Sequence, residues 1–208
     1  MNRVRLLLLG LLIALVVVVP GRAADDDPIG KVTRIQGAGM AMQNALPRPL
    51  KTGETILAGD VLSTGKGARL EVTLADGTVL TLGEKAVMVV SEFVMGNAPN
   101  AALRLLQGAF SATTGKIMQT ADASFQVKTE VATIGVRGTT FWGGMLDNNF
   151  EVAMLGGKGV YVETAVGRVE LTEAGQGTAI ADPKSAPAAP SAWGKAKIDR
   201  AVATVSFK

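Results

Sequence analysis

The sequence predicts an all-β fold: Gly-rich short strands in a solenoid-like or twisted-sandwich domain, followed by a short C-terminal amphipathic helix. The 208 residues include 25 glycines, and short runs of Val, Leu, Ile and Thr lie between them. Several runs alternate apolar and polar residues, which is the period of a strand with one buried face. Short strands separated by glycine turns are typical of sandwiches, barrels and solenoids.

The N-terminus has the order of residues found in a secretory signal. Arg3 and Arg5 form a basic start, an unbroken apolar run follows over Leu6–Val19, and small residues then lead to a cleavage position after Ala23. Residues 1–23 are therefore predicted to be a signal peptide that exports the chain to the periplasm. The alternative is an uncleaved anchor, but the apolar run is shorter than the roughly 20 residues that a membrane-spanning helix needs.

The clearest predicted element after the leader is a β-hairpin around Asp76-Gly77. In Ala68–Leu74 the apolar residues occupy every second position, and Leu80 and Leu82 resume the pattern beyond the turn. Asp-Gly is a strong signal for a tight hairpin turn. The same reasoning predicts a β domain over residues 24–181. Its predicted strands are Ile29–Gln36, Asp60–Thr64, Ala68–Leu74, Val79–Leu82, Leu103–Leu106, Ala109–Thr113, Phe125–Thr129, Val131–Val136, Thr139–Leu146, Phe150–Leu155, Gly159–Glu163 and Arg168–Thr172.

The C-terminal part of the chain has a different composition. Residues 182–192 are rich in Pro and Ala and are predicted to be a linker. Residues 193–208 are predicted to form a short amphipathic helix, because apolar residues lie at helical spacing at Ile198, Ala201, Val202 and Val205. This helix either packs back on the β domain or serves as a docking element for a partner.

Composition excludes several classes of function. The chain has no Cys and no His, so Ser-His-Asp and Cys-His catalysis and disulfides are ruled out. The net charge is +3, from 21 basic and 18 acidic residues, and three of the basic residues are Arg3, Arg5 and Arg22 of the leader. The remaining chain is close to neutral, so we expect no nucleic-acid partner.

Four segments, in order along residues 30–178, resemble the FecR domain family. Gly53–Gly65 is similar to the family's opening around a Gly-Asp pair, and Leu74–Gly83 is similar to its Asp-Gly hairpin. Leu103–Phe110 resembles a pair of strands joined at a glycine, and Thr129–Thr139 resembles a segment that ends in Arg-Gly-Thr. The resemblance implies a periplasmic, β-rich domain.

The resemblance also implies a role in signalling. The founding members of the family relay a signal from an outer-membrane transporter to a cytoplasmic sigma factor, and they carry a cytoplasmic segment before their membrane helix. Here only Met1–Arg5 precede the apolar run. We therefore expect a stand-alone envelope domain without anti-sigma activity of its own and without a membrane span once the signal has been removed.

The candidate site residues lie together at the end of the fourth segment: Arg137, Gly138, Thr139, Phe141 and Trp142. Arg137 is predicted to lie in a turn, where it either bonds neighbouring carbonyl groups or contacts a partner. Phe141, where the family often has an aromatic residue, and Trp142 should face opposite sides of one strand. An outward Trp142 is either a binding anchor or a cover for the sheet.

No pattern in the sequence predicts catalysis, a cofactor or a metal. Phosphate-binding loops and nucleophile elbows are missing, and most of the candidate carboxylates lie in turns or on outward strand positions. The sequence therefore predicts a non-enzymatic module that binds or senses another envelope protein. A cell-wall or carbohydrate-binding module is the alternative, although an aromatic content of 4% argues against a large row of exposed rings. A hydrolase without His is the third hypothesis.

Overall fold

The computed structural model describes residues 28–208. The predicted signal peptide lies outside the described residues. Within them, no helix is long and apolar enough to cross a membrane.

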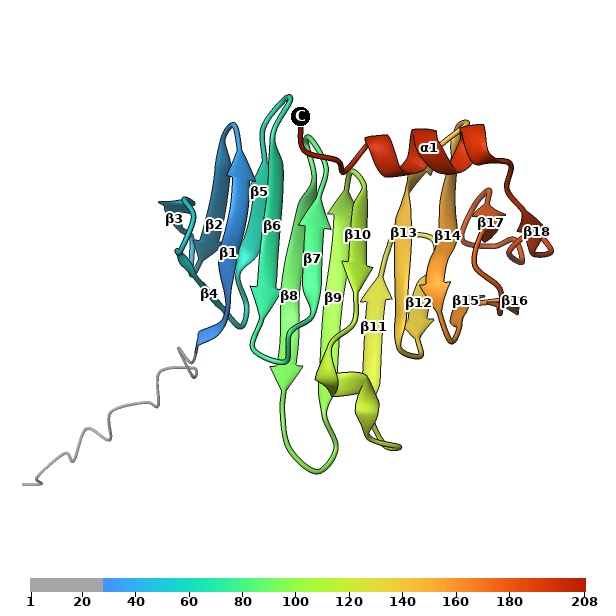
Figure 1. The fold of residues 1–208 in the computed structure, drawn as a ribbon, viewed down its shortest axis with the longest axis horizontal. Helices are drawn as coiled ribbons and strands as arrows, with labels where there is room; N and C mark the ends of the chain where they lie inside the picture. The colour runs from blue at the N-terminus through green and yellow to red at the C-terminus, as the bar shows by residue number, and fades with distance from the viewer. Residues whose placement is uncertain (1–27) are drawn as a thin grey trace, which may run out of the picture.

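Two nine-stranded sheets pack face to face as a β-sandwich (Figure 1). Sheet A contains, in spatial order, β18 (Ser191–Ala192), β17 (Gln176–Ile180), β14 (Asn149–Gly157), β13 (Thr139–Leu146), β10 (Phe110–Thr113), β7 (Val79–Leu82), β6 (Arg69–Leu74), β1 (Pro28–Gln36) and β4 (Thr55–Leu57). Sheet B contains β16 (Gly167–Leu171), β15 (Val160–Thr164), β12 (Thr133–Val136), β11 (Ser124–Lys128), β9 (Asn100–Gln107), β8 (Val87–Val94), β5 (Val61–Thr64), β2 (Gly39–Gln43) and β3 (Leu46–Pro49).

Successive segments of the chain add strands alternately to sheet A and to sheet B, along one axis of the sandwich. Hairpins alternate between the layers: β6 and β7 join sheet A, β8 and β9 join sheet B, and β13 and β14 return to sheet A. The colours of Figure 1 accordingly run in sequence order from one side to the other. The all-β prediction is confirmed. The architecture is a sandwich, and its stepwise growth explains why the sequence also suggested a solenoid.

Alternating side chains fill one continuous core between the sheets. In β6 the residues Leu70, Val72 and Leu74 point inward, and Leu80 and Leu82 of β7 lie opposite them. The predicted Asp76-Gly77 turn joins the two strands, with Gly77 at φ +86°. A residue with a side chain is strained in this left-handed conformation, which accounts for the glycine.

Six strands were not predicted, and their local sequences explain why. β2 contains Gly39 and Ala41 in place of large apolar residues, and β3 contains Pro47 and Pro49. β4 and β18 are only three and two residues long, β17 carries small residues, and β8 is interrupted by a bulge between Val90 and Glu92. These strands form because neighbouring strands pair with them, which their own patterns do not reveal. A 3₁₀ turn, η1 (Lys116–Gln119), was also not predicted.

The predicted C-terminal helix is confirmed as α1 (Lys195–Ala203), and it packs on the outer face of sheet A. Ala201 and Val205 are buried there in a small apolar cluster with Trp142. Two ion pairs fix the helix: Lys197 Nζ lies 2.6 Å from a buried Glu151 carboxylate, and Arg200 binds Asp147 through two bonds of 2.8 Å. Of the two roles considered for this helix, the structure shows the one in which it packs on the domain.

The Pro/Ala-rich segment 182–192 lies against the edge of sheet A. Ala188 donates its N–H to the carbonyl of Ala179 at 2.9 Å, and its own carbonyl accepts the Thr178 hydroxyl at 2.6 Å. Pro187 is buried. The segment predicted as a linker is therefore held along β17 by hydrogen bonds.

Candidate functional site

The residues that carry the family resemblance are mostly turn-stabilising groups. Asp60 is fully buried and accepts hydrogen bonds from the Leu57 N–H and the Arg48 guanidinium. Asp76 accepts from the N–H and hydroxyl of Thr78 and from the N–H of Ile117. Buried polar groups need such partners to offset the loss of water. These residues therefore fix the scaffold and are not available to a ligand.

Thr139 plays the same part in the turn where the candidate residues lie. Its buried hydroxyl donates to the carbonyl of Gly159 at 2.9 Å and accepts the Gly159 N–H at 3.0 Å. Gly138 before it has φ +61°, a conformation that favours glycine. Thr139 thus ties the β12–β13 turn to the β14–β15 turn, a role that the sequence analysis had considered for Arg137.

Phe141 and Trp142 face opposite sides of β13, as the alternation predicts. Phe141 lies in the main core, with edge-to-face contacts to Phe110 at 5.5 Å and Phe125 at 6.4 Å between ring centroids. Trp142 faces outward from the sheet, but it has no exposed surface, because α1 covers it and Thr204 accepts its indole N–H at 2.9 Å. In this structure Trp142 therefore belongs to the helix interface, and it is not an exposed anchor.

Arg137 is the candidate residue that reaches solvent. Its side chain is 65% exposed, and its guanidinium lies 3.8 Å from the Glu170 carboxylate, which also binds Arg168 at 2.8 Å. Lys158 lies close by in the β14–β15 turn and forms no ion pair with any residue of 28–208. One carboxylate is thus shared by two guanidinium groups beside a free ammonium, which leaves the surface positively charged.

A stack of side chains on sheet B forms the floor beside Arg137. Gly135 lies directly under the Tyr161 ring, and a Cβ at this position would overlap the ring. The Arg168 guanidinium lies over the same ring, 3.8 Å from its centroid, and Gln126 donates to the Tyr161 hydroxyl at 3.3 Å. This arrangement holds Tyr161 flat against the sheet. Sequence reasoning missed it, although a glycine in the middle of a strand often marks such a close approach.

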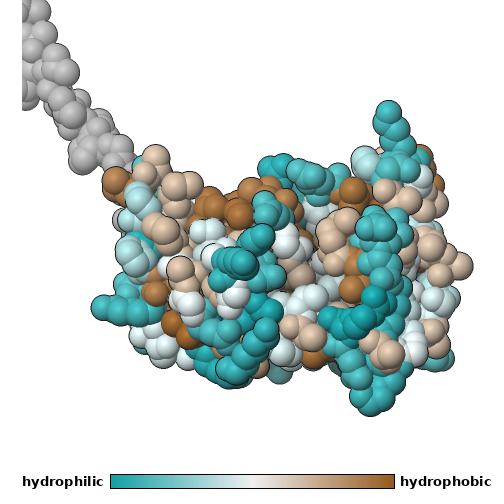
Figure 2. Space-filling view, turned by 90° about the horizontal axis from the view of Figure 1, so that it is seen from above, coloured by the Kyte–Doolittle hydropathy of each residue, from teal (hydrophilic) through white to brown (hydrophobic). Residues whose placement is uncertain are grey.

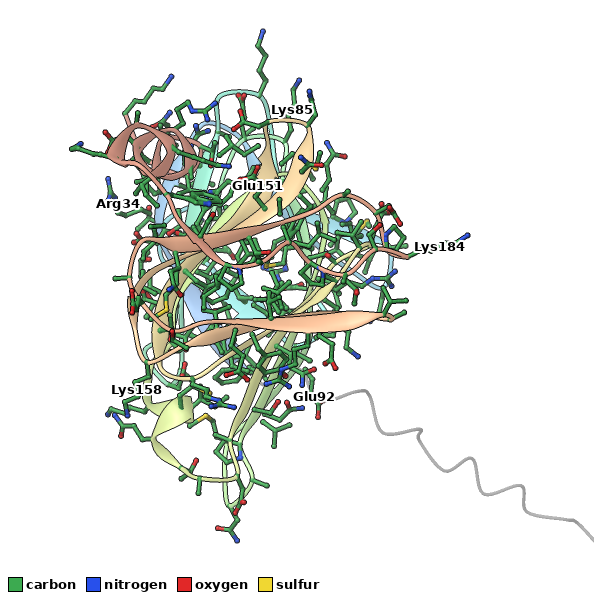
Figure 3. All side chains as sticks on the ribbon, turned by 90° about the vertical axis from the view of Figure 1, so that its right-hand side faces the viewer. Arg34, Lys85, Glu92, Glu151, Lys158 and Lys184 are labelled. Carbon is green, nitrogen blue, oxygen red and sulfur yellow. The ribbon has the colours of Figure 1, made fainter. Side chains whose placement is uncertain are left out.

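These groups surround a hollow of about 340 Å³ between sheet B and the segment that follows η1. Arg137, Lys158, Tyr161 and Ser124 line it from sheet B and its turns, and Thr120 lines it from the segment after η1. Figure 3 shows Lys158 beside the 3₁₀ turn, at the end of the sandwich opposite α1. We call this set of five residues the cationic surface. Two positive charges next to hydroxyl donors suit an anionic group.

Residues 28–208 hold no group of three acidic side chains placed to share a metal ion. No carboxylate of the described residues lines the hollow of the cationic surface, and Glu170 stands in the adjoining hollow beside Arg137. The arrangement supports binding through charge and hydrogen bonds.

The fold and this surface define a two-sheet β-sandwich domain with a positively charged end. The chain belongs to the FecR family, because the family model described as FecR protein matches residues 60–170, more than half of the sequence. Membership is consistent with a role in signalling. The match ends before α1 and begins after β4, so residues at both ends of the sandwich lie outside it.

Two crystal structures of a candidate anti-sigma factor from Parabacteroides distasonis have a similar fold. The TM-scores are 0.55 and 0.54, the sequence identity is 20% in both cases, and the alignments cover 67% of this chain. The chain spans 62% of the length of these proteins. At this identity the similarity establishes the fold alone. No curated protein matches the sequence.

Proposed function

We propose that this chain is a non-catalytic signalling module of the cell envelope that binds another envelope protein through the cationic surface. The observation that carries the proposal is Lys158, which has no acidic partner among residues 28–208, beside Arg137, whose ion-pair partner Glu170 is shared with Arg168. Both residues stand on turns of a rigid sandwich, which is where binding residues are commonly placed. The fold shared with a candidate anti-sigma factor supports a partner that is a protein.

The chemistry of the cationic surface favours an acidic segment of the partner. Carboxylates would pair with Lys158 and Arg137, and the hydroxyls of Thr120 and Ser124 could donate to the same groups. The Tyr161 ring is covered by Arg168, so it offers no free face on which a sugar could stack. This covering favours a protein partner over the carbohydrate-binding alternative.

We also propose that the mature protein is located in the periplasm. The leader-like residues 1–23 support export, cleavage after Ala23 and a mature protein in the periplasm. Expression of the full chain in a Gram-negative host, followed by intact-mass analysis of the periplasmic fraction, tests this directly. We expect the mass of a protein that begins at Ala24. A full-length mass in the membrane fraction would instead show an uncleaved anchor.

Site-specific photo-crosslinking in cells tests the binding surface. A photoreactive amino acid at Ala121, which lines the same hollow, should give a discrete protein adduct, whereas the same group at Thr113, on the outer face of sheet A, should not. Replacing Arg137 or Lys158 by Ala in the 121-labelled protein should weaken the adduct, and replacing the exposed Lys66 by Ala should leave it unchanged. Adducts to glycan alone would support the carbohydrate-binding alternative, and equal adducts from both labelled positions would contradict the proposed surface.

A further inference from the structure

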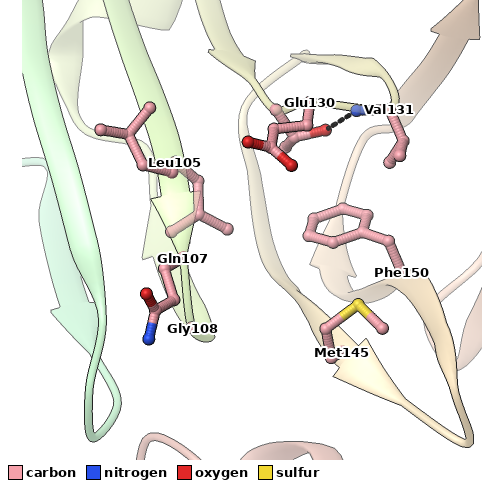
Figure 4. A pocket seen from close by; sticks show the side chains of 9 residues that line it. Leu105, Gln107, Gly108, Glu130, Val131, Met145 and Phe150 are labelled. Carbon is pink, nitrogen blue, oxygen red and sulfur yellow. Dashed lines mark hydrogen bonds between the residues drawn. The ribbon is translucent and has the colours of Figure 1, made fainter.

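A second pocket lies at the end of the sandwich that carries α1, opposite the cationic surface. It has a volume of about 210 Å³ and opens between the two sheets (Figure 4). Its lining is mostly apolar; Gln107 and Thr129 also line it, and an acidic side chain stands at the mouth. The residues that line it include Leu105, Leu106, Glu130, Val131, Met145 and Phe150. We call this the end pocket.

Two tight turns form opposite walls of the end pocket. Gly108 turns the chain from β9 into β10 with φ +88°, and a Cβ there would press on Ala86, so the turn lies tightly against its neighbour. The Thr129 hydroxyl accepts the N–H groups of Val131 and Ala132, which fixes the β11–β12 turn on the opposite wall. The pocket is thus formed by constrained turns and does not depend on flexible side chains alone.

The size and lining of the end pocket suit one large apolar side chain. Its volume is below the roughly 300–1,000 Å³ of pockets that bury whole drug-sized ligands. Phe150 and Leu105 form a buried floor, while Met145 and Leu106 are 59% and 39% exposed at the rim. Seen from this end, the apolar surface is divided into separate areas by hydrophilic side chains (Figure 2). A single anchor residue therefore fits better than a broad apolar interface.

The negative charge of Glu130 at the mouth of the end pocket favours a particular kind of residue next to the inserted apolar side chain. Glu130 is exposed, its carboxylate stands by the opening in Figure 4, and no basic residue of 28–208 pairs with it. An unpaired carboxylate beside an apolar pocket favours a ligand with a basic group next to its apolar part.

The groove continues beyond the end pocket, as an extended ligand would require. A neighbouring hollow of about 220 Å³ shares Gly108 and Met145 with it and is also lined by Arg69, Glu84 and Thr204. Arg69, which is almost completely buried, forms part of the wall of this second hollow. The two adjoining hollows give room for a ligand longer than one side chain, such as an extended peptide.

We propose that the end pocket binds an extended peptide segment of a protein, with a large apolar side chain inserted and a Lys or Arg beside it paired with Glu130. This inference goes beyond the proposed function, because it lies at the other end of the sandwich and selects the opposite charge. It gives the domain two chemically distinct binding sites.

Titration with short synthetic peptides tests the proposal on the full mature chain. The probes are blocked pentapeptides of sequence GGLKG, GGAKG and GGLEG, and the readout is the ¹³C-methyl NMR signal of Met145. We expect GGLKG to shift this signal at millimolar concentration, and GGAKG to bind at least about tenfold more weakly, because it cannot fill the pocket. GGLEG should also bind more weakly, because its carboxylate faces Glu130.

Two variants separate pocket filling from charge. Val131→Phe should abolish the shift by occupying the pocket, and Glu130→Gln should remove the preference for GGLKG over GGLEG without changing the fold. Glu92→Gln, another exposed carboxylate, and Arg137→Ala, at the opposite end, should change neither result. Equal shifts from GGLKG and GGAKG, an unchanged preference in Glu130→Gln, or no shift at all would overturn the proposal while leaving the cationic surface unaffected.

Discussion

At the scale of single residues, the Thr139 hydroxyl stabilises the turn that presents Arg137. Thr139→Val would keep the shape of the side chain and leave the N–H of Gly159 without its partner. A buried unsatisfied group costs about 1–3 kcal/mol, so we expect a loss of stability of this size in urea unfolding. Thr139→Ser should retain most of the stability. Thr140→Val, which removes an exposed hydroxyl on the next residue, is the control, and an equal loss there would contradict the assigned role.

Substitution of Gly135, under the Tyr161 ring of the cationic surface, should also reduce the stability of the fold. In Gly135→Ala the new methyl group would overlap the Tyr161 ring, and overpacking of this kind typically costs about 1–3 kcal/mol. Urea unfolding should show this loss. In the background Tyr161→Ala the same substitution should cost much less, because the ring is no longer there. A cost that is the same in both backgrounds would contradict the direct contact.

The sequence alone identified the turn, but it did not show which residue stabilises the turn and which one reaches solvent. Arg137, Gly138 and Thr139 were singled out because they stand together between apolar strands, and the structure places all three in one turn. Thr139 bonds the scaffold because Gly159, in the β14–β15 turn, lies beside it. The local sequence around residues 137–139 does not reveal this contact. For the same reason Lys158 could not be found from sequence: it becomes relevant only through its position beside Arg137.

At the scale of elements, the docking of α1 can be followed with the protein's own fluorescence. The chain has two tryptophans, Trp142 and Trp193, and their rings meet near the helix at 6.3 Å between centroids. Removing residues 195–208 should expose Trp142 to water and shift the emission to longer wavelength, while the far-UV circular dichroism of the β-sheets persists. A truncated protein with unchanged emission would show that the helix does not shield the ring.

The docking of α1 should also depend on pH. Hydrogen bonds from Arg200 lower the pKa of Asp147 below its usual value. A carboxyl group whose pKa is depressed by folding stabilises the folded state above its unfolded pKa of about 3.9, and this contribution is lost as the pH falls through the folded value.

An acid titration of the tryptophan emission measures this contribution. The emission should begin to shift below about pH 4, and Asp147→Asn should remove that component and loosen the helix at neutral pH. Because the Asp147–Arg200 pair is partly exposed, the effect should be small and should weaken with added salt. Asp199→Asn, which breaks the exposed Lys195–Asp199 pair within α1, is the control. If both variants titrate like the wild type, the Asp147 pair does not contribute.

Prediction from sequence was most successful for strands that bury one face by alternation, as in β6 and β7. It failed for β2, β3 and β4, whose residues are small, contain proline or are too few to show a period. These strands lie at the far edge of the sandwich, where pairing with β1 and β5 supplies the order. Local sequence carries little information where a neighbouring strand determines the structure.

At the scale of the whole molecule, the edges of the sheets decide whether the sandwich stays separate from other copies. β3 is an edge of sheet B, and its Pro47 and Pro49 have no N–H to offer a new strand. Replacing both by Thr should create an edge that pairs with other chains, seen as concentration-dependent oligomers in light scattering. Replacing the exposed Lys51 and Lys66 by Thr is the matched control. A monomeric Pro47→Thr/Pro49→Thr protein would show that the prolines do not protect this edge.

The return of the C-terminal segment across sheet A has a consequence for the order of assembly. The strands add one after another along the chain, but Phe207 lies against Arg34, and the Lys208 N–H bonds the Gln36 side chain at 2.9 Å. During synthesis, most of the sandwich can therefore form in the order in which it emerges. The outer cover over Trp142, however, follows every described strand in the sequence, and it can dock only once the sheet beneath it has formed. Until then the nascent domain presents an uncovered tryptophan, a surface that a chaperone could recognise.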